Sequence, residues 1–151
     1  MLQLATPADR EAVERLARQI HEFHTAWRPD LYEMPDVLYT QERFDAAIRS
    51  RSLYIASIGD TVIGYCLLAV REISGPGVCK RKVMRIVEFC VEESLRSQGF
   101  GTDMMEDVRA LAAAFRCTDL ELGVYPQNDD AVGFWQKCGF TIRAIEMQRT
   151  V

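Results

Sequence analysis

One stretch, residues 83–115, restricts the fold most strongly because its hydrophobic period changes once along its length. Up to residue 91, apolar side chains occupy both alternating faces, which indicates a strand buried on much of both sides. From Gly101 onward, apolar residues recur at three- and four-residue steps, which predicts an amphipathic helix. A buried strand that leads through a turn into such a helix is typical of an α/β domain. The strand positions are Val83, Ile86, Val87, Phe89, Cys90 and Val91, and the helix positions are Met104, Met105, Val108, Leu111, Ala112 and Phe115.

The turn between strand and helix, residues 96–101 (RSQGFG), combines a cation with two glycines. Glycine lets the backbone turn sharply and lets a ligand come close to it. The first N–H groups of a helix have no partner within the helix, and they carry the positive end of its dipole. The turn is therefore a candidate phosphate site, to which Arg96 would add a direct charge contact. An ordinary strand-to-helix turn is the alternative.

Two sequence patterns in the second half of the chain point to one family. The pattern Arg96-x-x-Gly99-x-Gly101, placed between a buried strand and a helix, resembles the acetyl-coenzyme A signature of the GNAT superfamily of N-acetyltransferases. The segment 128–140 (NDDAVGFWQKCGF) is similar to the C-terminal motif of that family. Two motifs in the family's order are more specific than either motif alone, whereas the first half of the chain fits the family only in outline.

The resemblance implies a site for acetyl-coenzyme A as co-substrate, in a cleft where two parallel strands separate. The pantetheine arm would bind along the central strand, and the diphosphate would bind at the glycine turn. Residues of the C-terminal motif would complete the site. The implied binding residues are Phe89, Cys90, Val91, Arg96, Ser97, Gln98, Gly99, Phe100, Gly101, Thr102, Asn128, Phe134, Trp135 and Lys137.

Length and composition predict an ordinary globular protein. A chain of 151 residues is expected to form a single domain over residues 1–151. Its 48% hydrophobic and 26% charged residues are typical of soluble domains. A net charge of −4 argues against nucleic-acid binding. Because charges interrupt every apolar run, we expect no signal peptide, no membrane partner and a cytoplasmic location.

No metal site is predicted from the cysteines and histidines. The five cysteines have no metal-ligand spacing, and we expect them to be reduced thiols. His21 and His24 are three residues apart, but no carboxylate or cysteine completes a site beside them.

The periodicity along the chain predicts a mixed α/β sheet of about seven strands flanked by about four helices. This agrees with the fold that the resemblance implies, a GNAT-like sheet whose central strands separate. Asn128 is a good N-cap for the last helix. The expected strands are residues 2–5, 53–58, 61–70, 83–91, 120–125, 140–142 and 144–148, and the expected helices are residues 7–27, 41–49, 101–115 and 128–137.

Acetyl transfer to an amine requires a base, because an ammonium group with a pKa of about 10 has no lone pair. The candidates are Glu88, Glu92 and Glu121. Glu121 is preferred because it lies in an otherwise apolar strand, where an unpaired charge needs a reason. The alternative is a structural carboxylate paired with a cation such as Arg143.

Trp135 stands where the resembled family usually has the tyrosine that protonates the departing thiolate. An indole N–H donates a hydrogen bond but is not a practical acid. Tyr125 or solvent could take over this role, or the thiolate could leave unaided. Slow or absent turnover is the remaining alternative.

Several functions therefore compete. A dinucleotide-binding unit is disfavoured because Met104 replaces the third glycine of its fingerprint. A coenzyme A-binding sensor or scaffold without catalysis is kept open by Trp135. For an enzyme, the aromatic segment 21–39 favours a small-molecule amine over a protein or peptide amino group, with His24, Trp27 and Tyr32 as candidate substrate contacts. A homodimer is expected from the resemblance alone.

Overall fold

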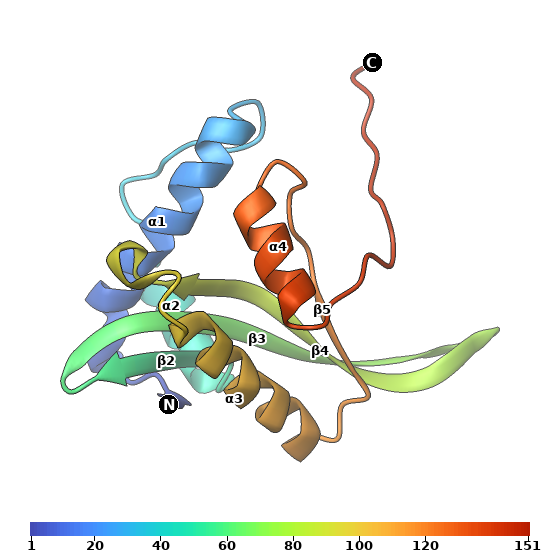
Figure 1. The fold of residues 1–151 in the computed structure, drawn as a ribbon, viewed down its shortest axis with the longest axis horizontal. Coiled ribbons are helices and arrows are strands. Elements are labelled where there is room, and N and C mark those ends of the chain that lie inside the picture. The colour runs from blue at the N-terminus through green and yellow to red at the C-terminus, as the bar shows by residue number, and fades with distance from the viewer.

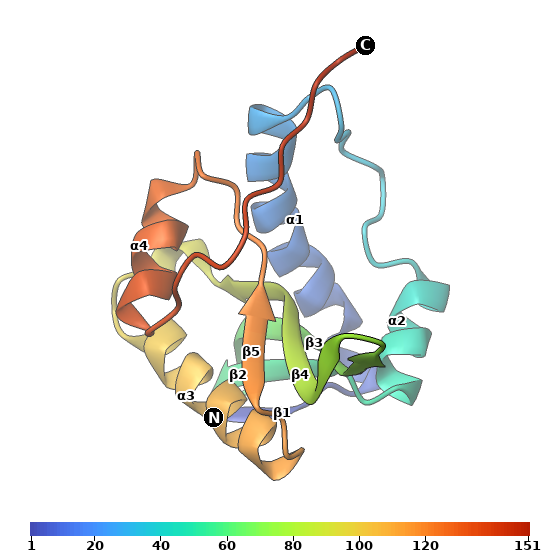
Figure 2. The same cartoon turned by 90° about the vertical axis from the view of Figure 1, so that its right-hand side faces the viewer.

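A five-stranded sheet in the order β1-β2-β3-β4-β5 forms the centre of the computed structural model, which describes residues 1–151 (Figure 1). Helices α1 and α2 pack against one face of the sheet, and α3 and α4 cover the other (Figure 2). The strands are β1 (Leu2–Leu4), β2 (Leu53–Ile58), β3 (Thr61–Gly75), β4 (Val78–Val91) and β5 (Asp119–Leu122). The helices are α1 (Arg10–Trp27), α2 (Gln41–Arg49), α3 (Phe100–Ala114) and α4 (Asp129–Lys137), with single 3-10 turns at Pro7–Asp9 and Glu93–Leu95.

The sheet is mixed, as predicted. Strands β1 to β4 pair antiparallel with their neighbours, whereas β4 and β5 are parallel. The β4–β5 pairing runs from Val83 opposite Asp119 to Ile86 opposite Leu122, and β5 then ends. Since β4 continues to Val91, its last five residues have a neighbouring strand on the β3 side only.

A β-bulge at Val87 changes which faces the end of β4 presents. Leu68 of β3 pairs with Ile86 and the preceding Leu67 pairs with Glu88, so Val87 is an extra residue in the ladder. Its side chain is 49% exposed. The prediction that Val87 is one of the buried positions of this strand is therefore wrong, because an inserted residue shifts the phase of every residue after it.

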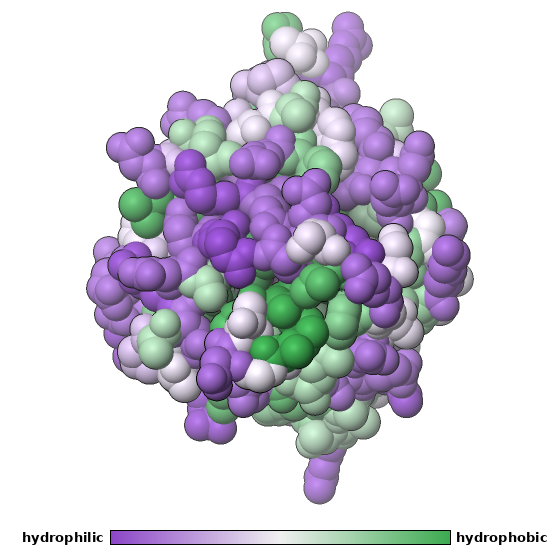
Figure 3. All heavy atoms as spheres, turned by 60° about the vertical axis from the view of Figure 1, so that its left-hand side comes forward, coloured by the Kyte–Doolittle hydropathy of each residue, from purple (hydrophilic) through white to green (hydrophobic).

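Two large apolar clusters fill the two sides of the sheet. On the α1–α2 side, Val13, Leu16, Phe44 and Tyr65 pack together. The cluster on the α3–α4 side contains Met84, Ile86, Met105, Val108 and Trp135. Elsewhere the surface is mixed, and Figure 3 shows one face on which apolar side chains gather in a patch bordered by hydrophilic ones.

The two closing strands predicted at residues 140–142 and 144–148 are not formed, so the expectation of about seven strands is wrong. Residues 141–151 are exposed and have no regular structure. None of their backbone groups forms a backbone hydrogen bond. An alternating pattern specifies a strand only when another strand's edge supplies the hydrogen bonds, and this segment lies against none.

The four predicted helices are all present. Asn128 caps α4 as expected, because its side chain accepts a hydrogen bond from the Ala131 N–H at 3.1 Å. None of the helices combines the length and the apolar character that crossing a membrane requires.

Candidate functional site

The site begins at the unpaired edge of β4. The strand passes beyond the end of β5 for residues 87–91, and its backbone on that side faces no other strand. Phe89 and Val91 lie on the α3–α4 face, whereas Glu88 and Cys90 lie on the α1–α2 face. The strand edge can therefore form backbone hydrogen bonds with an extended ligand, as in strand addition.

The turn after β4 holds a row of free backbone donors. None of the N–H groups of residues 97–102 donates to a protein acceptor. Gly99 is the N-cap of α3 and has a left-handed conformation with φ of 95°, which a side chain would strain. With no side chain capping α3, the donors and the positive end of its dipole lie open at this turn.

Arg96 is already engaged by protein acceptors. Its Nε donates to the carbonyl of Val91 at 3.0 Å, and its Nη2 donates to Gln19 Oε1 at 3.3 Å. The guanidinium also lies 5.6 Å from the ring centroid of Phe23. Arg96 thus joins the end of β4 to α1, and these contacts favour a role in shaping the turn.

Aromatic rings pack beneath the turn. A Cβ on Gly101 would lie 3.3 Å from the ring of Phe134, so α3 approaches α4 closely at this glycine. Phe134 packs against Trp135 with ring centroids 4.8 Å apart, and Phe89 and Phe140 lie 5.1 and 5.4 Å from Trp135. The Trp135 side chain is buried in this cluster and supports the turn from below.

Two other predicted binding residues lie on α4. Asn128 uses its side-chain oxygen to cap the helix. Lys137 is the last residue of α4, is exposed and forms no ion pair.

Glu88 lies among three donors on the α1–α2 side. Its Oε2 accepts hydrogen bonds from the hydroxyls of Tyr39 at 2.5 Å and Tyr65 at 2.9 Å. Its Oε1 accepts from Arg43 at 2.5 Å. Burial, together with the charge of Glu88, raises the pKa of Tyr39 and of Tyr65, so both phenols stay protonated as donors.

Glu88 forms an ion pair with Arg43, and the other two candidate bases are also held in ion pairs. Glu92 pairs with Arg15 and accepts a hydrogen bond from Gln19 at 2.7 Å, which ties α1 to the turn. Glu121 is 8% exposed and contacts three guanidinium groups. They belong to Arg143 at 2.6 Å, Arg71 at 3.3 Å and Arg81 at 3.4 Å. The Arg143 contact is the pairing that the sequence left open as the structural alternative.

Three aromatic residues from distant segments meet beside the end of β5. His24 of α1 stacks on Tyr32 with ring centroids 5.1 Å apart, and it lies 5.6 Å from Tyr125. The hydroxyls of Tyr32 and Tyr125 are 2.7 Å apart and hydrogen-bonded. We call these three residues the aromatic cluster. Trp27 stands apart from it, stacked on Phe23 at 5.3 Å.

The aromatic cluster contains two groups with shifted pKa values. Burial and the adjacent His21 lower the pKa of His24, although Glu88 acts in the opposite direction. The hydrogen bond with Tyr32 raises the pKa of Tyr125. At neutral pH the cluster therefore presents a neutral imidazole and a protonated phenol.

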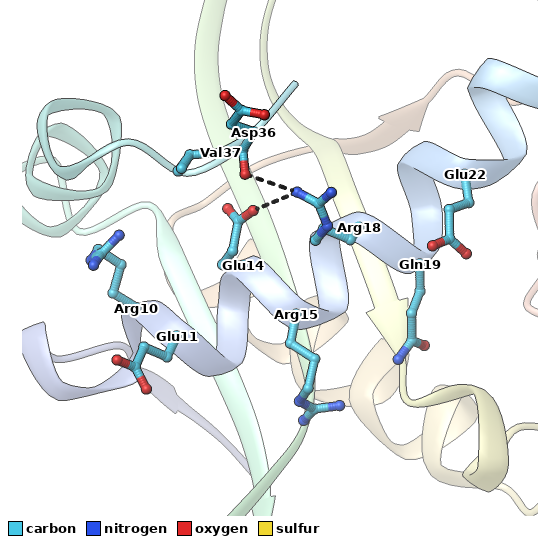
Figure 4. Close-up of a pocket in the computed structure, with 9 residues that line it drawn as sticks. All are labelled: Arg10, Glu11, Glu14, Arg15, Arg18, Gln19, Glu22, Asp36 and Val37. Atoms are coloured by element: carbon cyan, nitrogen blue, oxygen red, sulfur yellow. Dashed lines mark hydrogen bonds and ion pairs between the residues drawn. The ribbon is translucent and has the colours of Figure 1, made fainter. Parts of the chain in front are cut away.

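A hollow of about 540 Å³ lies along α1, and its lining includes Arg15 and Gln19, which contact Glu92 (Figure 4). Arg18 donates to Glu14 at 3.3 Å and to the backbone oxygen of Asp36 at 3.2 Å, so these charges hold a loop against the helix. We assign no site to this hollow because it contains none of the predicted site residues. The lining residues are Arg10, Glu11, Glu14, Arg15, Arg18, Gln19, Glu22, Asp36 and Val37.

The partners of Glu88 were not predicted. Tyr39, Tyr65 and Arg43 lie 49, 23 and 45 residues from Glu88 along the chain. No local pattern could have associated them with Glu88. No group of three or more histidine, cysteine, aspartate or glutamate side chains is placed to hold a metal ion.

Comparisons with known proteins agree on one family. Residues 17–140 match the family model described as Acetyltransferase (GNAT) family. The uncharacterized N-acetyltransferase YvbK of Bacillus subtilis (strain 168) is 30% identical over 103 residues, which make up 68% of this chain and 61% of YvbK. The match thus spans less than two thirds of that relative.

Solved structures share the complete fold. A mutant of the BH1408 protein from Bacillus halodurans superposes with a TM-score of 0.95 at 26% identity, covering 100% of this chain and 99% of that one. An aminoglycoside N-acetyltransferase, AAC(6')-Iy, in complex with CoA, superposes with a TM-score of 0.71 at 15% identity, covering 100% of both chains.

Proposed function

The chain belongs to the GNAT acetyltransferase family, and from this premise we propose that it transfers an acetyl group from acetyl-coenzyme A to a primary amine, with a small molecule as the favoured acceptor. One observation carries the proposal. The unpaired edge of β4 leads directly into a turn whose N–H groups, at residues 97–102, have no protein acceptor. An arm rich in amides that ends in a diphosphate matches this order of features.

Acetyl-coenzyme A binds, in this proposal, along the end of β4. The backbone of residues 89–91 bonds the pantetheine arm, and the N–H groups of residues 98–102 receive the diphosphate. Arg96 holds the turn in shape through Val91, and Phe134 supports the first turn of α3 at Gly101. The presence of CoA in the structural relative AAC(6')-Iy supports this choice of co-substrate.

Glu88 is our candidate for the base. The proton of the acceptor ammonium passes to its carboxylate, directly or through a water, and the freed lone pair attacks the thioester carbonyl carbon. A C–N bond forms as the C–S bond breaks, and coenzyme A departs as a thiolate. The nitrogen then loses its second proton to solvent, and the thiolate takes a proton from the acid described next. Glu88 is preferred over Glu121 because two of its three donors are neutral phenols and only one is a guanidinium group, whereas three guanidinium groups contact Glu121.

Tyr125 is our candidate for the acid. Its pKa is raised by the hydrogen bond with Tyr32, so it remains a protonated donor at neutral pH. It lies on the segment after β5, beside the point where β4 and β5 separate. The phenol of Tyr125 would then do the work of the motif tyrosine, because Trp135 stands at that tyrosine's position in this chain.

The aromatic cluster also favours a small-molecule amine as the acceptor. Rings from His24, Tyr32 and Tyr125 form a confined and partly apolar wall, which suits a small amine with an apolar portion. A protein or peptide amino group is the alternative acceptor. A coenzyme A-binding sensor without turnover is the alternative function.

Calorimetric titration with acetyl-coenzyme A tests the proposal. We expect the wild-type chain to bind, Gly99→Glu to abolish binding, and Gly99→Asn to retain most of it. Asparagine tolerates the left-handed backbone, whereas glutamate adds both strain and a negative charge where the phosphates bind.

A panel of amines, assayed by released thiol, then tests turnover. Binding together with turnover of at least one small amine would support the enzyme. Binding without turnover of any amine or peptide would favour the sensor, and absence of binding would refute the site.

A further inference from the structure

Arg85 of β4 lies on the same face of the sheet as Glu88. Glu88 is opposite Leu67 of β3, a residue that packs in the cluster on the α1–α2 side. Arg85 is opposite Ala69, which follows two positions later on the same face of β3. Residues two positions apart on a strand are separated by about 7 Å. The two side chains are therefore neighbours along β4, on the face that α1 and α2 cover.

The guanidinium group of Arg85 has no protein partner. It forms neither an ion pair nor a hydrogen bond, although Arg85 lies directly opposite Glu121 in the β4–β5 register. Both oxygens of Glu121 are occupied by other cations. Its Oε2 contacts Arg71, and its Oε1 contacts Arg81 and, from the C-terminal segment at residues 141–151, Arg143. Because Glu121 is saturated, Arg85 is left able to bind another carboxylate.

This guanidinium group is open to solvent where β4 and β5 begin to separate. The two strands run side by side as far as Ile86 and Leu122 (Figure 2). Beyond them, Nη2 of Arg85 lies 3.4 Å from the position that a Cβ on Gly123 would take. No buried side-chain nitrogen or oxygen lacks a hydrogen-bond partner, so the unpartnered nitrogens of Arg85 are accessible. Arg85 thus borders the candidate site.

The charged groups around Glu88 and Glu121 leave an excess of positive charge. Five arginines accompany three carboxylates there, whereas the chain as a whole carries a net charge of −4. A local excess of this kind attracts an anion. The groups are Arg43, Arg71, Arg81, Arg85 and Arg143, with Glu88, Asp119 and Glu121.

We propose that Arg85 binds a carboxylate of the acceptor, and that the acceptor is a free α-amino acid whose amine faces Glu88. The inference rests on the proposed acetyl transfer and names the class of its acceptor. A guanidinium group suits a carboxylate because its paired N–H donors match the two oxygens. Neighbouring side chains of β4 would then hold the two charged groups of the amino acid, with Glu88 at the amine and Arg85 at the carboxylate.

The chain after Gly123 also indicates which amino acids fit. Tyr125 follows two residues later and belongs to the aromatic cluster, with its ring centroid 5.6 Å from that of His24. An acceptor held at Arg85 would extend its own side chain toward this wall. Apolar and aromatic amino acids are therefore the favoured acceptors.

Matched acceptors test the proposal. A panel of free α-amino acids is assayed beside the corresponding carboxamides, with acetyl-coenzyme A as donor and released thiol as the readout. The amide keeps the amine and replaces the carboxylate by a neutral group of nearly the same size. We expect kcat/KM of at least one amino acid to exceed that of its amide at least about tenfold, as hydrogen bonds to charged groups contribute about that much. Equal values for both forms throughout the panel would refute the proposal.

The substitution Arg85→Met removes the charge and keeps an unbranched side chain. We expect it to lower kcat/KM for the preferred amino acid about 10- to 100-fold, mainly through KM, and to leave the amide within about twofold. Arg71→Met is the matched control, because it removes the same charge from the same face but from an arginine paired with Glu121. It should preserve the preference for the amino acid. Equal losses for amino acid and amide in Arg85→Met would indicate a structural role and contradict the assignment.

Binding measurements separate this proposal from the proposed activity. The same pairs are titrated calorimetrically into the protein with and without coenzyme A. If an amino acid binds more tightly than its amide, Arg85→Met removes the difference and nothing is acetylated, the Arg85 site stands and acetyl transfer fails. If amides are acetylated as well as amino acids, acetyl transfer stands and the Arg85 site fails. Absence of both binding and acetylation would refute both.

Discussion

At the residue scale, Glu88 and Glu121 differ in the donors that surround them. Glu88 accepts hydrogen bonds from two neutral phenols and one guanidinium group. Glu121 contacts three guanidinium groups, which belong to Arg71 of β3, Arg81 of β4 and Arg143 of the C-terminal segment. These surroundings support our proposal of Glu88 as the base, and they favour a structural role for Glu121.

Replacing each glutamate by glutamine should separate the two roles. We expect Glu88→Gln to lower kcat about a hundredfold or more, because a positioned base contributes that much to proton transfer. Glu121→Gln should keep kcat within a few-fold while lowering the free energy of unfolding by about 1 kcal/mol, since the three arginines that pair with Glu121 are 31% to 63% exposed and solvent screens such pairs. Steady-state kinetics across pH and urea unfolding measure the two effects. Full activity in Glu88→Gln would contradict the assignment.

His24 should make the fold sensitive to mild acid. Burial lowers its pKa below the ordinary value of 6.5, so the unfolded chain binds a proton at a pH where the folded chain does not. The free energy of unfolding therefore falls as the pH drops below 6.5, and the stability is present above that pH. His24→Phe keeps an aromatic ring in the cluster and should lose less stability on acidification. Urea unfolding on each side of pH 6.5 measures both proteins. If the wild type and His24→Phe lost the same free energy of unfolding, His24 would not be the source of the acid sensitivity.

At the scale of elements, the candidate site arises from three features of the unit formed by β4, the turn and α3. The bulge at Val87 changes the phase of β4, so that Glu88 lies on the α1–α2 side and Phe89 on the α3–α4 side. The early end of β5 leaves the edge of β4 open. Finally, Gly99 begins α3 without a capping side chain and leaves its N–H groups free.

The contact between α3 and α4 at Gly101 gives a further prediction. A branched side chain there would overlap the ring of Phe134, which lies 3.3 Å from the position of a Cβ. We expect Gly101→Val to lower the free energy of unfolding by about 1 to 3 kcal/mol, as overpacking usually does.

We also expect Gly101→Val to weaken acetyl-coenzyme A binding, because the valine stands at the free N–H groups of the turn. Gly133→Val is the matched control, since a Cβ on this α4 glycine would meet open space. Its free energy of unfolding should stay within about 0.5 kcal/mol of the wild type, as is usual for surface substitutions. Thermal unfolding and calorimetric titration of both variants check the pair. If both variants lost similar amounts of stability and of binding affinity, the contact between Gly101 and Phe134 would not account for the effect.

At the scale of the whole molecule, β5 is the last strand of the sheet and borders the candidate site. At its carboxyl end, its separation from β4 opens the candidate acetyl-coenzyme A site. Along its outer edge, it lacks a partner beside an exposed C-terminal segment. Arg28 links the two regions, because it bonds Gln148 of that segment and lies on the loop that carries Tyr32.

Local sequence determined the main elements of this protein. The period change at residues 83–115 predicted the central strand, the turn and α3, and it did so because hydrophobic spacing reflects which face of each element is buried. The glycine turn and the Asn128 cap could also be predicted, because turn and cap geometry depend on a few neighbouring residues.

Only the tertiary structure decided the bulge at Val87, the ring of donors around Glu88 and the meeting of His24, Tyr32 and Tyr125. The same holds for the unpaired segment 141–151, which has the pattern of a strand but no partner edge. These features depend on contacts between residues far apart in the chain. Local periodicity specifies which face of an element is buried, but it does not specify which distant residue meets that face, or whether the partner belongs to the same chain.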